Sequence, residues 1–423
     1  MSIKSEIEVA PDKSISHRAL MVSAISNGVS HIKNFLKADD CISTMNCLRK
    51  LGVDIVEKNN EIIVKGKGLK LKMPSEALDA GNSGTTVRLL SGILAGQDFA
   101  TKIIGDESLS KRPMKRIIEP LEKMGAKIES NNNYLPIEIK GGNLKNINYE
   151  SKISSAQMKS CVLFAGLYAD GITSFSEPEK SRDHTERMLK NFGAEIFANK
   201  NIISIKGIAR LRSSDIFVPG DISSAAFFIV AATIVQNSRL TIGQAGLKIK
   251  NVGINPTRTG IIDVLRRMGA KILFENEREI AGEPIADIIV RPSELKSTNI
   301  EQSEIPLLID EIPIIAVAAT QSKGTTKITG AKELRVKETD RLKAISVELK
   351  KMGADIQELE DGLIIKGPTK LNGAKVNSYK DHRIAMSLAI ASLVAEGETE
   401  ILDKDCVSIS FPEFWKILAK ITR

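Results

Sequence analysis

The sequence predicts an α/β protein of two domains, each built from three copies of one helix-and-strand unit. Three observations support this fold class. The chain of 423 residues is longer than one hydrophobic core usually serves. A pattern that combines an amphipathic helix with strands recurs along it. A second pattern, of almost wholly apolar helices, alternates with the first.

The first pattern is an amphipathic helix that ends at a glycine and is followed by strand-like alternation. Leu and Phe recur at helical spacing before each glycine, where a left-handed residue would end the helix. The alternation that follows predicts a strand, and Asn-Asn or Glu-Asp-Gly supplies a hairpin turn. The glycines are Gly52, Gly125, Gly193, Gly269 and Gly353. A sixth such helix is expected at "FPEFWKILAKI", and the N-terminal "IKSEIEV" could supply the strand that it lacks.

The second pattern is a polar loop that leads into a helix of small and apolar residues, followed within about five residues by a short strand. Helices that are apolar on every side must be buried, whereas amphipathic helices cover an outer face. We therefore expect buried helices surrounded by sheets and amphipathic helices. The six segments are 11–26, 80–96, 154–169, 219–235, 307–320 and 379–395.

The repeats divide the chain into two predicted domains. Repeats one to three would form a domain of residues 12–219. Repeats four to six, completed by the N-terminal strand, would form a domain of residues 1–11 plus 220–423. The chain would cross between the domains near Pro11 and near Pro219, in both places just before an apolar helix.

Composition narrows the class of protein. Apolar residues make up 42% and charged residues 26%, and no apolar run of about 18 residues exists, so no membrane span is expected. The N-terminus has no apolar stretch typical of a secretory signal. The four cysteines are scattered without a CxxC pair, which favours reduced thiols in the cytoplasm over disulfides or a zinc site.

The polar loops carry the candidate site residues. A helix N-terminus attracts anions through its unbonded N–H groups and its partial positive charge. Lys111 and Arg112 precede Pro113, which suits the first turn of a helix, and we expect Lys337 and Arg341 to share a helix face. Asp310 follows apolar residues and is a candidate general base. The other candidates are Lys13, Ser14, Arg18, Gly84, Lys111, Ser154, Ser155, Gln157, Ser181, Arg182, His184, Glu338, His382 and Arg383.

A simpler interpretation covers part of this pattern. Ser, Thr, Asp and Asn cap helices for local bonding alone, and a single Arg near a helix start usually faces solvent. Yet at least five Lys or Arg residues stand in equivalent loops, which is more than capping requires. No Walker A or dinucleotide-binding spacing is present.

Seven segments, in order along the chain, carry a resemblance to a known family: "DKSISHR", "GNSGTTVRLL", "DESLSKRPMKRIIEPLEKMGA", "SAQMKSCVLFAGL", "SRDHTERML", "RVKETDRL" and "DHRIAM". Together they resemble the motifs of the 5-enolpyruvylshikimate-3-phosphate synthases. The resemblance implies a two-domain inside-out α/β barrel of six βαβαββ-type repeats, with the active site in the cleft between the domains. It implies transfer of the carboxyvinyl group of phosphoenolpyruvate to the 5-hydroxyl of shikimate 3-phosphate, through a tetrahedral intermediate, in chorismate and aromatic amino acid biosynthesis.

The resemblance also implies roles for individual residues. Asp310 would take the hydroxyl proton, Glu338 would serve the methylene carbon C3, and Lys13 would touch both substrates as a cation or proton donor. The residues implied for shikimate 3-phosphate are Lys13, Ser14, Arg18, Ser154, Ser155, Gln157, Asp310 and Lys337. Those implied for phosphoenolpyruvate are Lys13, Gly84, Arg112, Gln157, Arg341 and Arg383, with His382 nearby. No metal or organic cofactor is implied.

Three positions depart from the pattern of the better-known branch of the family. Glu333 stands where that branch has Asn, Ile409 where it has a phosphate-facing Lys, and His184 where Tyr is common. The chain therefore resembles the more divergent branch. Gly84 keeps the small residue beside the phosphoenolpyruvate pocket, which implies that glyphosate competes with phosphoenolpyruvate.

Two alternatives remain beside this interpretation. A related enolpyruvyl transferase that acts on a UDP-sugar would have Cys in the loop "SLSKRPM", and this chain has none there. A basic nucleic-acid-binding protein would fit the formal charge of +8, but aromatics are only 4% and no tract of five Lys or Arg occurs. We expect a cytoplasmic monomer with small-molecule substrates and with no nucleic-acid or membrane partner.

Overall fold

The chain divides into two compact units. The computed structural model describes residues 5–208, 210–235 and 246–422. We call Pro11–Val218 with Glu279–Glu283 the N-terminal unit, and Met1–Ala10, Pro219–Arg278 and Pro284–Arg423 the C-terminal unit. Residues 279–283 differ from the expected division, because they belong with the N-terminal unit. That these units are domains with an active site between them stays a prediction.

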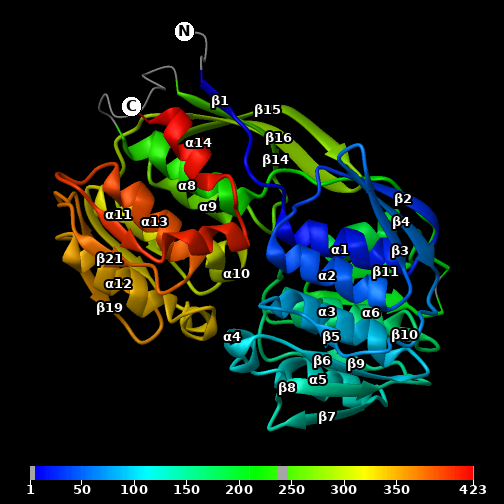
Figure 1. Ribbon diagram of the computed structural model, residues 1–423. Helices are drawn as coiled ribbons and strands as arrows, with labels where there is room; N and C mark the ends of the chain where they lie inside the picture. The colour runs from blue at the N-terminus through cyan, green and yellow to red at the C-terminus, as the bar shows by residue number, and fades with distance from the viewer. Residues whose placement is uncertain (1–4, 209, 236–245, 423) are drawn as a thin grey trace. The chain divides into compact units, whose positions relative to one another are not determined.

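The N-terminal unit contains three successive repeats, coloured blue to green in Figure 1. The first has α1 (Lys13–Ala24), β2 (Asn27–Lys33), α2 (Asp39–Lys50), β3 (Asp54–Lys58) and β4 (Glu61–Lys67). The second has β5 (Leu78–Asp79), α3 (Gly84–Ala95), β6 (Ala100–Ile104), α4 (Glu107–Ser110), α5 (Lys115–Lys123), β7 (Lys127–Asn131) and β8 (Tyr134–Lys140). The third has β9 (Asn148–Glu150), α6 (Ala156–Gly166), β10 (Ile172–Ser176), α7 (His184–Asn191), β11 (Ile196–Asn199), β12 (Ile202–Lys206) and β13 (Ile216–Phe217).

The C-terminal unit repeats this order. It begins with β1 (Ser5–Ile7) and continues with α8 (Ile222–Ile234), β14 (Leu247–Gly253), α9 (Gly260–Arg267), β15 (Lys271–Ile280) and β16 (Glu283–Arg291). Then come β17 (Asn299–Ile300), α10 (Ile305–Leu308), η2 (Ile309–Glu311), α11 (Ile312–Thr320), β18 (Gly324–Ile328), η3 (Lys332–Val336), α12 (Arg341–Lys351), β19 (Asp355–Glu358) and β20 (Leu363–Gly367). The last repeat has β21 (Lys375–Asn377), α13 (His382–Ser392), β22 (Glu400–Leu402), η4 (Lys404–Ile409) and α14 (Phe414–Ile421).

Most of the sheets share one topology, in which an outer parallel pair continues into an antiparallel hairpin. The four-stranded sheets have the orders β13-β2-β4-β3, β5-β6-β8-β7, β9-β10-β12-β11, β1-β14-β16-β15 and β17-β18-β20-β19, and β21 pairs with β22 alone among the described strands. Parallel neighbours need a crossover. The apolar helices provide it, since α3, α6 and α13 each connect two parallel strands.

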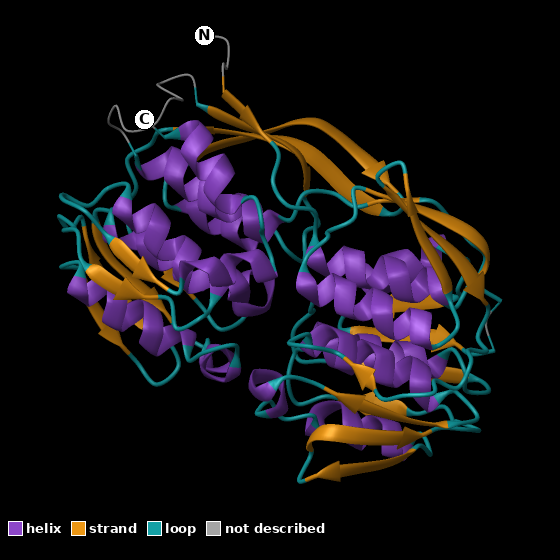
Figure 2. Ribbon diagram, in the orientation of Figure 1, coloured by secondary structure: helices purple, strands orange, loops and turns teal. Residues whose placement is uncertain are grey.

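All six predicted apolar helices are present and buried, which confirms this part of the prediction. Every residue of α8, for example, is buried. Figure 2 shows, within the N-terminal unit, helices stacked beside one another with strands along their outer side. The five predicted glycines have φ between +81° and +105°, so each ends its amphipathic helix in the left-handed region.

The N-terminal strand joins a different repeat from the one we expected. β1 pairs in parallel with β14 of the fourth repeat, with Ile7 opposite Ile249, and not with the last repeat. The first repeat is completed in the same way by β13, which pairs with β2. β1 and β13 are each the last strand before the chain passes from one unit to the other. Each strand forms the edge of a sheet in the unit that the chain is leaving. Residues 3–4 of the predicted strand, and the strand expected soon after α8 in 236–245, lie outside the described residues.

Candidate active site

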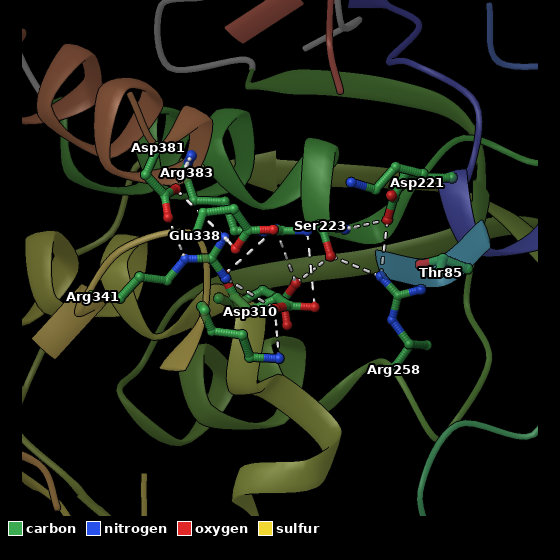
Figure 3. Close-up of polar contacts among 12 residues, drawn as sticks. Thr85, Asp221, Ser223, Arg258, Asp310, Glu338, Arg341, Asp381 and Arg383 are labelled. Atoms are coloured by element: carbon green, nitrogen blue, oxygen red, sulfur yellow. Dashed lines mark hydrogen bonds and ion pairs between the residues drawn. The ribbon is translucent and has the colours of Figure 1, made fainter. Parts of the chain in front are cut away.

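In the C-terminal unit, three segments bring together the predicted acids and cations (Figure 3). Asp310 lies in η2, Glu338 in the loop that follows η3, and Arg383 in the first turn of α13. Pro313 explains the first placement: a proline near the start of α11 lacks the N–H that would continue a helix from α10, so the chain bends at η2. Asp310 is thereby turned out of the helix.

Arg341 is the centre of this cluster. It is the first residue of α12, and its side chain is only 2% exposed. Its Nε lies 2.8 Å from Asp381 Oδ2, its Nη1 3.2 Å from Asp310 Oδ1, and its Nη2 2.7 Å from Glu338 Oε2. Burial by itself lowers the pKa of Arg341, but the charges of Asp381, Glu338 and Asp310 outweigh it, so the pKa is raised.

Asp310 also faces two further cations. Lys337 Nζ is 3.9 Å from Asp310 Oδ1, and Arg383 Nη2 is 3.9 Å from Asp310 Oδ2. Our expectation that Lys337 shares a helix face with Arg341 is wrong, because Lys337 is in an extended conformation before α12 begins. Lys337 and Arg383 thus approach the Asp310 carboxylate from different backbone conformations, since Lys337 is extended and Arg383 is helical.

The cluster places two carboxylates within reach of one guanidinium. Glu338 and Asp310 bind different nitrogens of Arg341, so two proton acceptors stand beside a fixed positive charge. Such an arrangement can move protons at a substrate whose own negative charge is held by Arg341, Arg383 and Lys337. Of the described residues, no group of three or more His, Cys, Asp or Glu is placed to hold a metal ion.

Beside these residues lies a second buried set that sequence reasoning did not identify (Figure 3). Arg258 Nη2 donates to Asp221 Oδ1 at 2.9 Å and to Ser223 Oγ at 2.7 Å. Ser223 donates to Glu311, whose Oε1 is 3.9 Å from Arg383 Nη1. Asp381 was also missed. The sequence offered two weak signals for these residues. One is the Asp-Glu pair at 310–311, and the other is the Asp that precedes each of α8 and α13, where a role as N-cap is a sufficient explanation.

In the N-terminal unit, Lys13, Ser14 and Arg18 lie inside α1, and not in a loop before it. Asp12 is the N-cap and accepts a hydrogen bond from Ile15 N at 2.8 Å, so the helix starts at Lys13. Lys13 Nζ is 3.0 Å from Asp40 Oδ2.

Arg18 is buried among hydroxyl and carbonyl oxygens. Its Nε donates to Thr185 Oγ1 at 2.6 Å, its Nη2 to Ser160 Oγ at 2.9 Å, and its Nη1 to Ser14 O at 3.0 Å. The residue is only 3% exposed. Burial lowers the pKa of Arg18 to about 10, although the charge of Glu186 opposes this. A buried cation with neutral partners is suited to an anionic ligand.

The start of α6 lies beside α3 and brings Gln157 to Arg88. Arg88 Nη1 donates to Gln157 Oε1 at 2.7 Å, and Gln157 Nε2 donates to Thr85 Oγ1 at 3.0 Å. Gly84 is the first residue of α3, and a Cβ there would lie 2.9 Å from Arg88 Nη1. A side chain at position 84 would therefore disturb the guanidinium that holds Gln157.

The remaining candidates of the N-terminal unit have local partners. Ser155 caps α6 by accepting a hydrogen bond from Met158 N, and Ser154 Oγ donates to Glu179 O at 2.6 Å. Arg112 lies between α4 and α5, where its Nη2 donates to Asn82 Oδ1 at 2.8 Å. Pro113 is not in the first turn of a helix as expected, because α5 begins at Lys115. Lys111 forms an exposed pair with Glu107.

The structure also places the three departures from the family pattern. His184 is buried, and its Nδ1 lies 2.8 Å from Glu283 Oε1 within the N-terminal unit. Glu333 lies in η3 and Ile409 at the end of η4, both partly exposed. The candidates thus form two groups, one in each unit: the acids with Lys337, Arg341 and Arg383, and the cations and hydroxyls around α1, α3 and α6.

None of the helices in the described ranges is long and apolar enough to cross a membrane.

Comparison with known proteins agrees with the motifs. The family model described as EPSP synthase (3-phosphoshikimate 1-carboxyvinyltransferase) matches residues 1–418. A protein of Endomicrobium trichonymphae named 3-phosphoshikimate 1-carboxyvinyltransferase is 55% identical over 100% of this chain and 98% of its own length. A protein of Bacillus pumilus with the same name is 52% identical over 99% of this chain and 97% of its own length.

Solved structures show the same fold. An EPSP synthase from Acinetobacter baumannii matches with a TM-score of 0.88 and 45% identity, over 100% of this chain and 96% of its own. The enolpyruvyl transferase NikO from Streptomyces tendae matches with a TM-score of 0.77 at 16% identity, over 99% and 95% of the two chains, and supports the fold alone. The family match, the identities and the two-unit fold of βαβαββ-type repeats together establish that this chain belongs to the EPSP synthase family, the 3-phosphoshikimate 1-carboxyvinyltransferases.

Proposed function

We propose that this chain carries out the family's reaction with Asp310 and Glu338 as its proton-transfer pair. The reaction moves the carboxyvinyl group of phosphoenolpyruvate to the 5-hydroxyl of shikimate 3-phosphate. The observation that carries the proposal is the cluster in the C-terminal unit, where both carboxylates contact the buried guanidinium of Arg341.

The reaction is an addition followed by an elimination, and both steps move protons. A proton is added to C3 of phosphoenolpyruvate while the 5-hydroxyl oxygen attacks C2 and loses its own proton, which gives a tetrahedral intermediate. Phosphate then leaves C2, and C3 returns a proton to the protein. Asp310 takes the hydroxyl proton, and Glu338 exchanges the proton at C3, with Lys13 as a cation at both substrates.

The cations bind phosphoenolpyruvate through its phosphate and carboxylate. Arg341 is fixed by hydrogen bonds to carboxylates of the same unit, so its N–H groups are pre-oriented, and Arg383 Nη2 lies 3.9 Å from one of these carboxylates, Asp310. Lys13, Gly84, Arg112 and Gln157 complete the proposed set. The hydrogen bond from Arg88 to Gln157 supports a role for the small residue at position 84.

Shikimate 3-phosphate uses the hydroxyl-rich region of the N-terminal unit. Arg18 is the anchor in this proposal, because a buried guanidinium with hydroxyl partners favours an anion. The other proposed ligands are Lys13, Ser14, Ser154, Ser155, Gln157, Asp310 and Lys337. Since this set draws on residues from both units, we propose that the units are the two domains that together form the active site.

We further infer that the enzyme acts as a cytoplasmic monomer, without a nucleic-acid or membrane partner. The scattered cysteines support the cytoplasmic location, and the scarcity of aromatic residues supports the lack of a nucleic-acid partner. Sedimentation of the purified protein with and without both substrates tests the oligomeric state, and a dimer mass would contradict the inference.

Phosphate release tests the assigned function. Wild type should release phosphate from phosphoenolpyruvate only when shikimate 3-phosphate is present. In Glu338→Gln the rate should fall about 10²–10⁴-fold, because the amide cannot exchange the proton at C3. Glu360→Gln is the matched control, since Glu360 forms an exposed pair with Lys332 in the same unit and should keep the wild-type rate.

Two outcomes would overturn this assignment. Phosphate release that depends on a UDP-sugar, and not on shikimate 3-phosphate, would favour the related transferase. A Glu338→Gln rate within tenfold of wild type would remove Glu338 from the proton-transfer pair while leaving the reaction intact.

A further inference from the structure

Two consecutive residues directly before the N-cap of α13 have a backbone conformation that their side chains disfavour. Tyr379 has φ +53° and Lys380 has φ +58°, in the left-handed region that glycine adopts more readily. This strained turn is followed at once by Asp381, which binds Arg341, and by Arg383, which faces Asp310. The conformation of this turn therefore determines the positions of Asp381 and Arg383.

A buried carboxylate on the neighbouring helix contacts this turn. Glu348 lies on α12, and its side chain is 0% exposed. Its Oε1 accepts a hydrogen bond from the Tyr379 hydroxyl at 2.6 Å, and its Oε2 accepts one from Asn377 N at 3.0 Å. Lys351 Nζ lies 2.9 and 2.8 Å from the two oxygens, so the buried charge is compensated.

Helix geometry connects Glu348 to the active-site cluster. Glu348 follows Arg341 by seven residues, which is about two turns, so the two side chains leave α12 on the same face. Arg341 binds Asp381 at one end of the turn, and Glu348 binds Asn377 and Tyr379 at the other. One rigid helix thus contacts both ends of the strained segment.

We propose that Glu348 and the Tyr379 hydroxyl are positioning residues, which hold the turn 377–380 in its left-handed conformation and so present Arg383 to phosphoenolpyruvate. The role at phosphoenolpyruvate rests on the proposed function. The bond from the phenol to a carboxylate also raises the pKa of Tyr379 to about 12, as expected for a hydroxyl that keeps its proton as a donor.

Nothing in this arrangement requires Tyr379 to be buried. The residue is 40% exposed, so its ring contributes little to the core, and its hydroxyl is the part that contacts buried Glu348. Tyr379→Phe removes that hydroxyl and leaves the ring. Its effect on the fold should therefore be small, which makes it a cleaner test than Glu348→Gln.

The experiment combines this variant with a glycine. Tyr379→Phe should raise KM for phosphoenolpyruvate about tenfold, the usual worth of a hydrogen bond to a charged group, and change KM for shikimate 3-phosphate less than about twofold. Tyr379→Phe combined with Lys380→Gly should recover most of the lost affinity, because glycine adopts the left-handed conformation without the hydroxyl's help. Lys200→Gly, at an exposed lysine with φ +52° in the N-terminal unit, is the matched control and should not rescue.

Amide hydrogen exchange gives a second measurement that does not depend on turnover. Exchange in 377–384 should become faster in Tyr379→Phe and slow again in the double variant. The proposal is overturned if KM for phosphoenolpyruvate stays within twofold of wild type, if the glycine does not rescue, or if exchange is unchanged. A wild-type protein that released no phosphate would instead refute the proposed function, and exchange would still decide whether Glu348 and Tyr379 hold the turn.

Discussion

Two buried arginines, Arg18 in the N-terminal unit and Arg341 in the C-terminal unit, have opposite surroundings. Both are at most 3% exposed; Arg18 lies in the middle of α1, and Arg341 is the first residue of α12. Arg18 donates to two hydroxyls and one carbonyl, whereas Arg341 contacts three carboxylates. The pKa of Arg18 is lowered to about 10 and that of Arg341 is raised, because burial opposes both charges but only Arg341 has carboxylates in direct contact.

This difference indicates how one repeated fold supports two tasks. The repeats supply the helices in both units, and the side chains around each helix decide what it can do. In the proposed function, Arg18, whose hydrogen-bond partners are neutral, binds an anionic ligand, so the N-terminal unit would be suited to substrate recognition. In the proposed function, Arg341 orients the two carboxylates that transfer protons, so the C-terminal unit would be suited to the chemical step.

The largest effect should come from replacing one of the carboxylates that contact Arg341. Asp310→Asn keeps the shape of the side chain but removes its capacity to take the 5-hydroxyl proton, so kcat should fall about 10²–10⁴-fold with smaller changes in KM. Steady-state kinetics with both substrates measures this. Asp355→Asn, at an exposed residue of β19, is the control and should keep the wild-type kcat. A rise in KM at unchanged kcat would make Asp310 a binding residue and break the division of tasks.

Replacing Arg18 should show the reverse pattern, a change in KM with little change in kcat. Arg18→Lys replaces a planar guanidinium, held by three bonds, with a single ammonium, so KM for shikimate 3-phosphate should rise about 10- to 100-fold while kcat changes little. Arg49→Lys, whose guanidinium bonds the Ile55 carbonyl in the same unit, should leave this KM unchanged. If kcat falls more than KM rises, Arg18 acts in the chemical step and the contrast with Arg341 disappears.

The smallest effect concerns the free energy of unfolding and depends on His17, the neighbour of Arg18 in α1. His17 is fully buried, its Nδ1 lies 2.7 Å from Thr44 Oγ1, and burial lowers its pKa to about 3. Because the unfolded chain binds a proton near pH 6.5 and the folded chain does not, stability rises with pH through this range and is lost as pH falls from 6.5 towards 3. Between pH 6.5 and 5 the loss from this residue is about 1.5 kcal/mol.

Urea unfolding at these two pH values checks the sign and the size of this effect. The wild-type free energy of unfolding should decrease on acidification by more than that of His17→Gln, which has no titrating ring. Carboxylates titrate in both proteins, so only the difference between them reports on His17. Parallel pH dependences would show that the folded protein accommodates the charged imidazole.

Much of the fold could be predicted because its signals are local. The left-handed glycines such as Gly52 and Gly353 end amphipathic helices, and the apolar segments become buried helices, as their patterns predict. The strand at Ser5–Ile7 was assigned to the wrong repeat. A strand of three residues carries no information about its partner, since either exposed sheet edge could accept it.

The site shows the same limit. The motifs identified Asp310, Glu338, Arg341 and Arg383, but helical spacing gave the wrong conformation for Lys337. Pro113 was expected in the first turn of a helix and instead precedes α5. Glu348, Tyr379 and Asp381 had no signal in the chain beyond ordinary helix and cap residues. Their contacts join segments about 30 to 40 residues apart, which no local pattern encodes.

The sequence by itself determined the repeat number, the alternation of buried and amphipathic helices, and the family, because these depend on periodicity and on motifs read in order. Only the tertiary structure decided which carboxylates share Arg341, which oxygens surround Arg18, and that a strained turn precedes α13. The physical reason is that charge and hydrogen bonding act over a few ångströms in space, and folding alone brings distant residues within that range.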